Sequence, residues 1–197
     1  REAELDAALA RVDRSQAELV FLGDSITQAW DPTLFGQFFG DRRALNLGVH
    51  GDGTQGVLWR LQQGQWGNMR PALVVLLIGT NNAAVGGRAE DIALGIAQII
   101  RFIHGRSPAT RILLLGLLPR GADARDPVRA VTTRVNQLVA RCADGRGTVY
   151  LDAGTLLTTP DGRLLEQVAF DRLHLTQVGY AILGAAITPT IRAMLGN

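Results

Sequence analysis

The sequence predicts an α/β fold, a three-layer α/β/α sandwich around a parallel sheet of about five strands. Two observations favour it. Short apolar runs rich in Val, Leu and Ile alternate along the chain with amphipathic segments of helical spacing. The run over residues 73–78 is apolar at every position, as in a strand covered by helices on both faces. Helices between successive strands imply right-handed crossovers and parallel neighbours.

In the first half of the chain, apolar residues at helical spacing predict an amphipathic helix over residues 1–14. The apolar run 18–23 predicts a first strand that ends in a glycine turn. Asp31 and Pro32 form an N-cap followed by proline, so a short helix should run from there to about Gly40. A second strand is expected over 44–47. A glycine-rich stretch then precedes a helix that carries Val57, Leu58 and Leu61.

In the second half, a central strand over residues 73–78 stops at a polar cluster, and isoleucines at helical spacing predict a helix over 88–104. A fourth strand is expected over 112–118. Asp126 and Pro127 open another helix, to about Cys142. A short fifth strand over 148–151 follows. Thr176 can then cap a last helix over 177–195.

Length and composition limit the classes of protein that fit. The 197 residues predict one domain, residues 1–197, and 47% hydrophobic with 19% charged residues is typical of a soluble globular chain. All 20 basic residues are arginine but they form no basic stripe, so no nucleic-acid partner is expected. No apolar run reaches the roughly 18 residues of a membrane span. Cys142 is the single cysteine, which excludes an internal disulfide. The chain begins with Arg1 rather than methionine, so its start predicts no compartment.

Polar residues follow the strands at the sheet edge where open α/β sheets bind ligands. Ser25 comes directly after the first strand and is the candidate nucleophile, because a serine can attack a carbonyl if a base takes its proton. His174 is the favoured base among three histidines. Asp171 lies three residues before it and can orient the ring, as in a serine–histidine–aspartate triad. His104 near a helix C-terminus is expected to have no catalytic role.

The oxyanion formed on such an attack needs preorganised hydrogen-bond donors. The backbone N–H groups of Ser25 and Gly51 and the side-chain amide of Asn81 follow three different predicted strands, and we expect them to converge. Glycine at position 51 permits a positive φ or a close backbone approach. Each motif alone is common in proteins; together and in this order they predict acyl transfer.

These motifs carry a resemblance that covers nearly the whole chain. The chain resembles the SGNH branch of the GDSL hydrolases in four blocks: Gly23-Asp24-Ser25-Ile26, Asn46-Leu47-Gly48-Val49-His50-Gly51-Asp52, Gly79-Thr80-Asn81-Asn82 and Asp171-Arg172-Leu173-His174. Within that branch it is most similar to the catalytic subunits of the intracellular platelet-activating factor acetylhydrolase family, also over residues 57–61 and 116–121. The resemblance implies a flavodoxin-like fold and ester hydrolysis without a metal or other cofactor, often on acetyl groups. It also permits a homodimer.

Four further residues are candidates for substrate binding. Ile26 and Leu173 flank the proposed nucleophile and base, where they could wall a small acyl pocket or belong to the core. His50 stands where the acetylhydrolase subunits have glycine, a departure that leaves a lipid-like substrate open. Arg120 could meet a leaving group or be a solvated loop residue. Asp24 and Asp152 are expected to be structural. Trp30, Trp59 and Trp66 are expected in the core or at its rim.

The sequence therefore predicts a serine esterase that removes short acyl groups, with acetyl favoured, from oxygen esters. Its substrate would be a small-molecule ester, an acetylated carbohydrate or polysaccharide, or a lipid-like acetyl ester. Two alternatives stay open. An acetyltransferase would use the same acyl-enzyme with a sugar hydroxyl in place of water, and a non-catalytic binding module would keep the fold without the reaction.

Overall fold

The computed structural model describes residues 14–196, so the helix predicted over residues 1–14 lies almost wholly outside the described residues. The chain forms one five-stranded sheet in the order β2-β1-β3-β4-β5, in which every neighbouring pair is parallel. The strands are β1 (Leu19–Gly23), β2 (Ala44–Gly48), β3 (Leu73–Leu77), β4 (Arg111–Leu115) and β5 (Thr148–Leu151). The predicted parallel sheet of five strands is confirmed.

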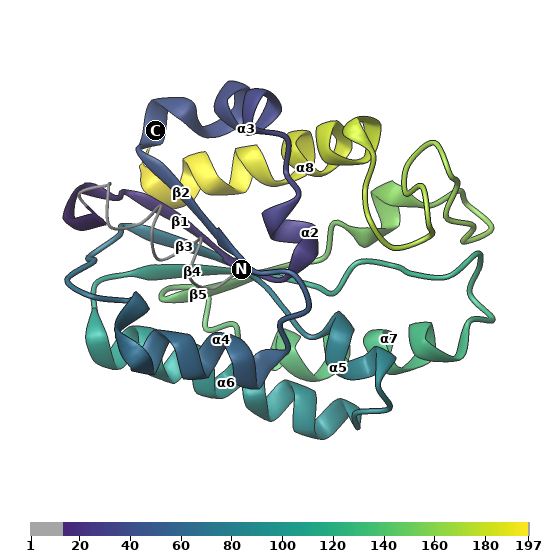
Figure 1. Cartoon of the computed structure of the whole chain (residues 1–197), viewed down its shortest axis with the longest axis horizontal. Helices are drawn as coiled ribbons and strands as arrows, with labels where there is room; N and C mark the ends of the chain where they lie inside the picture. Colours follow the sequence, from purple (N-terminus) through teal and green to yellow (C-terminus); the bar gives the residue numbers. More distant parts are fainter. Residues whose placement is uncertain (1–13, 197) are drawn as a thin grey trace.

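Helices cover both faces of this sheet (Figure 1). On one face lie α3 (Pro32–Phe39) and α8 (Gln177–Leu195); on the other lie α4 (Thr54–Arg60), α5 (Thr80–Ala84), α6 (Ala89–Arg106) and α7 (Pro127–Val139). A one-turn helix, α2 (Ser25–Gln28), follows β1. Short helical turns complete the chain: η1 (Arg14–Gln16), η2 (Gly40–Arg42), η3 (Leu61–Gln65), η4 (Ala140–Cys142) and η5 (Gly154–Leu157).

Alternate residues of the strands pack in two separate hydrophobic cores, because successive side chains of a strand point to opposite faces of the sheet. Val20, Val74 and Ile112 face α4, α6 and α7, whereas Phe21 and Val75 face α3 and α8. This is the three-layer arrangement that the sequence predicts. It leaves the carboxyl ends of the strands free to carry polar loops.

Two differences from the sequence prediction have clear causes. The fourth strand ends at Leu115, not at residue 118, because the backbone of Leu117 is bonded in both directions by the side chain of Asn136 instead of by a neighbouring strand. The helices α2 and α5 were not predicted. With four and five residues, they are too short to show a helical period.

Helix α8 is long and apolar enough to cross a membrane by length and composition alone. In the fold it covers the sheet, and its residues Tyr180, Leu183 and Ile187 are buried in the second core. A core helix of this kind passes the same test of length and composition.

Candidate active site

The position of Ser25 is fixed by the turn that joins β1 to α2. A Cβ atom on Gly23 would lie 2.1 Å from Oγ1 of Thr27 and 2.5 Å from the carbonyl oxygen of Leu77, so only glycine fits there. Asp24 caps the helix, and its Oδ1 accepts a 2.9 Å hydrogen bond from the N–H of Ile26. Ser25 is then the first residue of α2, and it is 6% exposed. A serine at a helix N-terminus has a backbone N–H without an acceptor inside the helix.

Ser25, His174 and Asp171 lie within hydrogen-bond distance in series. Oγ of Ser25 is 2.9 Å from Nε2 of His174, and Nδ1 of His174 is 2.6 Å from Oδ2 of Asp171. The other carboxylate oxygen of Asp171 accepts from the backbone N–H of His174 at 2.7 Å and of Leu173 at 3.0 Å. The geometry suits a serine whose proton passes to an imidazole that a carboxylate orients.

Two exposed rings flank the imidazole of His174. The ring of His50 is nearly parallel to it, with centroids 6.2 Å apart and an interplanar angle of 7°. The ring of Phe170, which is 62% exposed, lies 6.0 Å away at 21°. The ring of His50 therefore lies beside the proposed base, as a substrate contact requires. The backbone N–H of His50 donates to Oε1 of Gln28 in α2.

The predicted oxyanion donors follow the carboxyl ends of β1, β2 and β3, in segments that are bonded to one another. Gly51 has a φ of 84° and open space where a Cβ would lie, so backbone conformation rather than crowding favours glycine there. Its N–H has no acceptor among residues 14–196. The amide of Asn81 donates to the carbonyl of Asp52 at 2.8 Å, and its second N–H has no acceptor within the described residues 14–196.

Arg60 is a residue of this site that the sequence analysis did not identify. It is only 2% exposed, and its guanidinium pairs with Asp52 at 2.7 Å. It also donates to the carbonyls of Leu47 at 2.8 Å and Gly23 at 3.3 Å, so it joins the ends of β1 and β2 to the loop that carries Gly51. An arginine at helical spacing from the buried Val57 of α4 is the signal that could have revealed it.

Tyr180 also escaped the sequence analysis. Its buried hydroxyl reaches from α8 and donates to the carbonyl of Ile26 at 2.7 Å. This bond fixes the helix of the proposed nucleophile to α8. A single tyrosine in a long apolar helix was the only signal in the sequence.

Asp24 and Asp171 have pKa values shifted in opposite directions. Burial raises the pKa of Asp24 to about 6, against the lowering effect of its bond from Ile26 and of the nearby His174. Burial also acts to raise the pKa of Asp171, but hydrogen bonds from the ring and backbone of His174 outweigh it and hold that pKa below its ordinary value. Asp171 is therefore suited to remain ionised beside the imidazole.

The other predicted substrate-binding residues have partners inside the protein. Arg120 is not a freely solvated residue, because its guanidinium donates to Thr80 at both the carbonyl (3.2 Å) and the hydroxyl (3.1 Å). Ile26 is 2% exposed and belongs to the core, so it offers little surface to a substrate. Leu173 is half-buried against that core.

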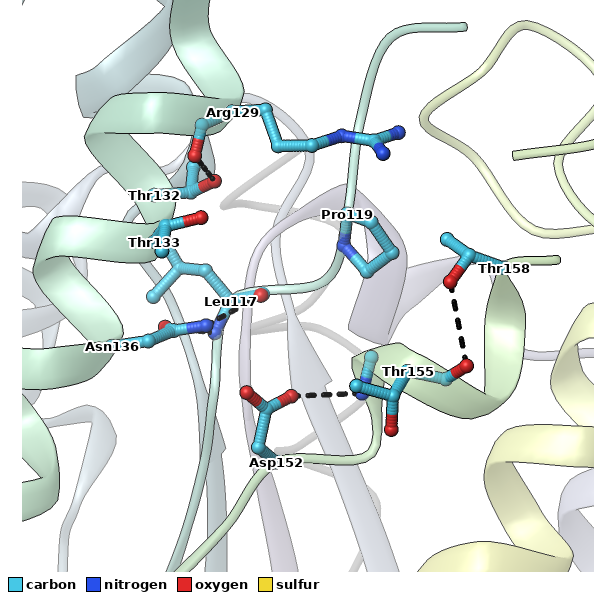
Figure 2. Close-up of a pocket in the computed structure, with 10 residues that line it drawn as sticks. Leu117, Pro119, Arg129, Thr132, Thr133, Asn136, Asp152, Thr155 and Thr158 are labelled. Atoms are coloured by element: carbon cyan, nitrogen blue, oxygen red, sulfur yellow. Dashed lines mark hydrogen bonds between the residues drawn. The ribbon is translucent and has the colours of Figure 1, made fainter. Parts of the chain in front are cut away.

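Asp152 and the tryptophans were expected to be structural residues. Asp152 accepts from the N–H of Gly154 at 2.9 Å and lines a pocket of about 150 Å³ between α7 and η5 (Figure 2). Trp30 and Trp66 are buried, whereas Trp59 is half-exposed at the rim. His104 lies in the last turn of α6, as predicted.

Comparison with known proteins places the chain among acyl hydrolases. The sequence model of the GDSL-like lipase/acylhydrolase family matches residues 21–182. The chain is 38% identical over 181 residues to the human platelet-activating factor acetylhydrolase IB subunit alpha1, covering 91% of this chain and 74% of the relative. It is 38% identical over 168 residues to the bovine alpha2 subunit, covering 84% and 72%.

Solved structures share the fold. A GDSL-like lipase from Bacteroides thetaiotaomicron superimposes with a TM-score of 0.76 at 24% identity, over 98% of this chain and 96% of that one. A carbohydrate acetylesterase family member from Sinorhizobium meliloti gives a TM-score of 0.71 at 18% identity, over 91% and 100%. At these identities the likeness shows the architecture alone.

Proposed function

The chain belongs to the GDSL-like lipase/acylhydrolase family, and from that premise we propose that it hydrolyses short-chain acyl oxygen esters through an acyl-enzyme on Ser25. That it is an ester hydrolase follows from the family. The nucleophile and the acyl group are our proposal. The observation that carries the proposal is the series Ser25, His174 and Asp171, with contacts of 2.9 Å and 2.6 Å.

In the first half-reaction, the hydroxyl of Ser25 gives its proton to Nε2 of His174 as Oγ attacks the ester carbonyl. Asp171 stays ionised, accepts from Nδ1 of the imidazolium and holds the ring toward Ser25. The imidazolium then protonates the leaving alcohol, and an acyl group remains on Oγ. In the second half-reaction, water gives a proton to His174 and attacks this ester, which releases the acid and restores Ser25.

The negative charge of each tetrahedral intermediate would be stabilised by the N–H groups of Ser25 and Gly51 and by the free N–H of Asn81. Three features support this assignment: the N–H of Ser25 begins a helix, that of Gly51 has no acceptor among the described residues, and Asn81 is bonded to the loop of Gly51. Arg60 and Tyr180 would keep the loops in place during the reaction.

We propose acetyl as the preferred acyl group and an acetylated carbohydrate, or a broad range of short-chain esters, as the substrate. Ser25 is 6% exposed beside buried Ile26 and half-buried Leu173, which favours a small acyl group. The curated relatives are named acetylhydrolases, and one fold neighbour is a carbohydrate acetylesterase family member. The ring of His50, exposed beside His174, is a candidate contact for the alcohol part of the ester.

The test is hydrolysis of p-nitrophenyl esters from acetate to octanoate, with wild type beside Ser25→Ala. We expect activity that is highest on acetate, falls with chain length and is lost in the variant. Full activity in Ser25→Ala would refute the acyl-enzyme, and a profile that rises toward octanoate would refute the small acyl group. If sugar acceptors yield acetylated sugar faster than free acetate, the protein is a transferase.

A further inference from the structure

The proposed base lies in a segment without regular secondary structure. Between η5 and α8, residues 158–176 contain no helix or strand, only one bridge between Ala169 and Leu175. Asp171 and His174 both belong to this segment, and Arg172 between them has a φ of 63°, a conformation that costs a non-glycine residue energy. Contacts between loops, made by backbone and side-chain groups, therefore fix the imidazole relative to Ser25.

Arg129 makes such contacts from the first turn of α7. Its guanidinium donates to three backbone carbonyls: Arg120 through Nε at 2.8 Å, Gly121 through Nη2 at 2.9 Å, and Gly162 through Nη1. Figure 2 shows the side chain leaving α7 and extending away from the helix above Pro119, toward the neighbouring loop. The planar, five-donor shape of guanidinium suits it to join carbonyls of two loops at once.

Those two loops lead directly to the proposed acid–base pair. The N–H of Gly121 donates to the carbonyl of Arg172 at 2.9 Å, and Leu164 donates to Ala122 at 3.0 Å. The guanidinium of Arg172 in turn donates to the carbonyl of Leu164. Arg129 is thus two hydrogen bonds away from residue 172, which lies between Asp171 and His174.

Burying the guanidinium of Arg129 costs desolvation free energy, which its hydrogen bonds must offset. The residue is 8% exposed, and within residues 14–196 no carboxylate lies within ion-pair distance of its guanidinium. Burial lowers the pKa of this guanidinium below its usual value. A buried cation needs its hydrogen bonds to offset desolvation, and removing it would leave three carbonyls to find other partners.

The N-cap of α7 fixes the position of Arg129 in the first turn of that helix. Asp126 caps α7 by accepting from the N–H groups of Val128 (2.9 Å) and Arg129 (3.3 Å). Gly121 packs against this cap so closely that a Cβ there would lie 2.1 Å from the Asp126 carboxylate, and its φ is 73°. The loop is therefore joined to α7 by both the cap and the guanidinium.

We propose that Arg129 is a positioning residue that holds the segment of Asp171 and His174 in register with Ser25. This inference rests on the proposed function, since it gives Arg129 a role only through the acid–base pair. Arg129 touches no reacting atom. Replacing it should slow the chemical step and disturb the hydrogen bond between His174 and Asp171, with little effect on substrate binding.

The test compares Arg129→Met and Arg129→Lys with Arg111→Met, each checked for a native circular dichroism spectrum. Arg111 is a matched control, because it also donates to two backbone carbonyls, those of Arg146 and Met194, but at the amino end of β4. With p-nitrophenyl acetate we expect Arg129→Met to lower kcat by about 10- to 100-fold with little change in KM, as misplaced catalytic groups do. Arg129→Lys should recover part of the loss, and Arg111→Met should behave as wild type.

A second readout does not depend on activity. The proton on Nδ1 of His174, bonded to Asp171, should give a low-field proton NMR signal that shifts or broadens in Arg129→Met but not in Arg111→Met. If Arg129→Met does not fold, Arg129→Lys is measured in its place. An unchanged kcat and NMR signal in the folded variant, or equal losses in Arg111→Met, would overturn the proposal. If Ser25→Ala stays active, the proposed function fails, and the NMR comparison alone decides on Arg129.

Discussion

The two halves of the proposed site are held in place by different forces. Ser25 follows a fully buried strand, and residues 21–27 are all buried, so sheet hydrogen bonds and hydrophobic packing determine its position. His174 and Asp171 lie on a half-exposed segment without helix or strand. Their position depends on hydrogen bonds within and between loops, including those from Arg129 and Arg172 to backbone carbonyls.

This difference indicates which substitutions should impair folding and which should impair only the reaction. Around Ser25, space is so limited that added atoms should destabilise the whole domain. Around His174, substitutions should lower the rate of the reaction in a protein that still folds. The predictions below test this contrast, beginning with the largest effect.

Removing either reacting group should abolish most activity. We expect Ser25→Ala and His174→Ala each to lower kcat/KM for p-nitrophenyl acetate by on the order of 10³-fold or more, while both remain folded. Since the two groups act as one unit, the double variant should be no worse than either single one. Asp171→Asn should lower kcat/KM less than either of these two substitutions does. Losses that multiply in the double variant would show that the residues act independently.

Two glycines should differ sharply in their effect on stability. Gly23→Ala forces a Cβ against Thr27 and the Leu77 backbone, so we expect the free energy of unfolding to fall by about 3 kcal/mol or more. Gly51→Ala meets only the cost of its positive φ, about 1–2 kcal/mol. Urea denaturation measures both. Equal losses would contradict the view that Gly23 is crowded whereas Gly51 is not.

The carboxyls of Asp24 and Asp171 should give opposite pH dependences of stability. The pKa of Asp24 is raised in the folded state to about 6 from 3.8, so the folded protein binds the extra proton between these values. The free energy of unfolding should therefore fall by up to about 3 kcal/mol as pH rises from about 4 to 6. Asp24→Asn keeps the capping oxygen and should remove this slope. Asp171, whose pKa is lowered, should instead favour folding at higher pH and lose that contribution on acidification.

Urea titrations between pH 4 and 8 on wild type and Asp24→Asn provide this comparison. Identical pH slopes for the two proteins would show that Asp24 does not titrate as its burial implies.

The smallest effect is expected at His50. His50→Gly removes an exposed ring beside His174 but keeps the backbone N–H that binds Gln28. We expect kcat/KM for acetate to change by less than about tenfold, as for loss of one ring contact, while longer acyl or bulkier alcohol groups become better substrates. Chain-length profiles of both proteins measure this. A loss as large as that of His174→Ala would make His50 part of the catalytic machinery.

Much of the fold was predictable because strands and long helices have local signals. The apolar runs gave β3 and β5 to within one residue, and Asp-Pro caps marked the starts of α3 and α7. Ser25 could be identified because it follows a buried strand. Asp171 and His174 could be identified only by motif and resemblance, because their segment has no periodicity.

Arg60, Tyr180 and Arg129 escaped the sequence analysis for a common reason. Each donates to backbone carbonyls outside its own helix, and any residue can supply a carbonyl. No pattern of residue types encodes such a contact. The contact of Arg120 with Thr80, 40 residues away, was equally invisible in the sequence.

The central claim is that Ser25 is a nucleophile activated by His174, and a serine-directed phosphonofluoridate tests it most directly. Intact mass and peptide mapping should show one adduct per chain, located on Ser25. The adduct should be absent from Ser25→Ala and should form far more slowly in His174→Ala. An unlabelled wild type, a label on another residue, or unchanged labelling of His174→Ala would contradict the account.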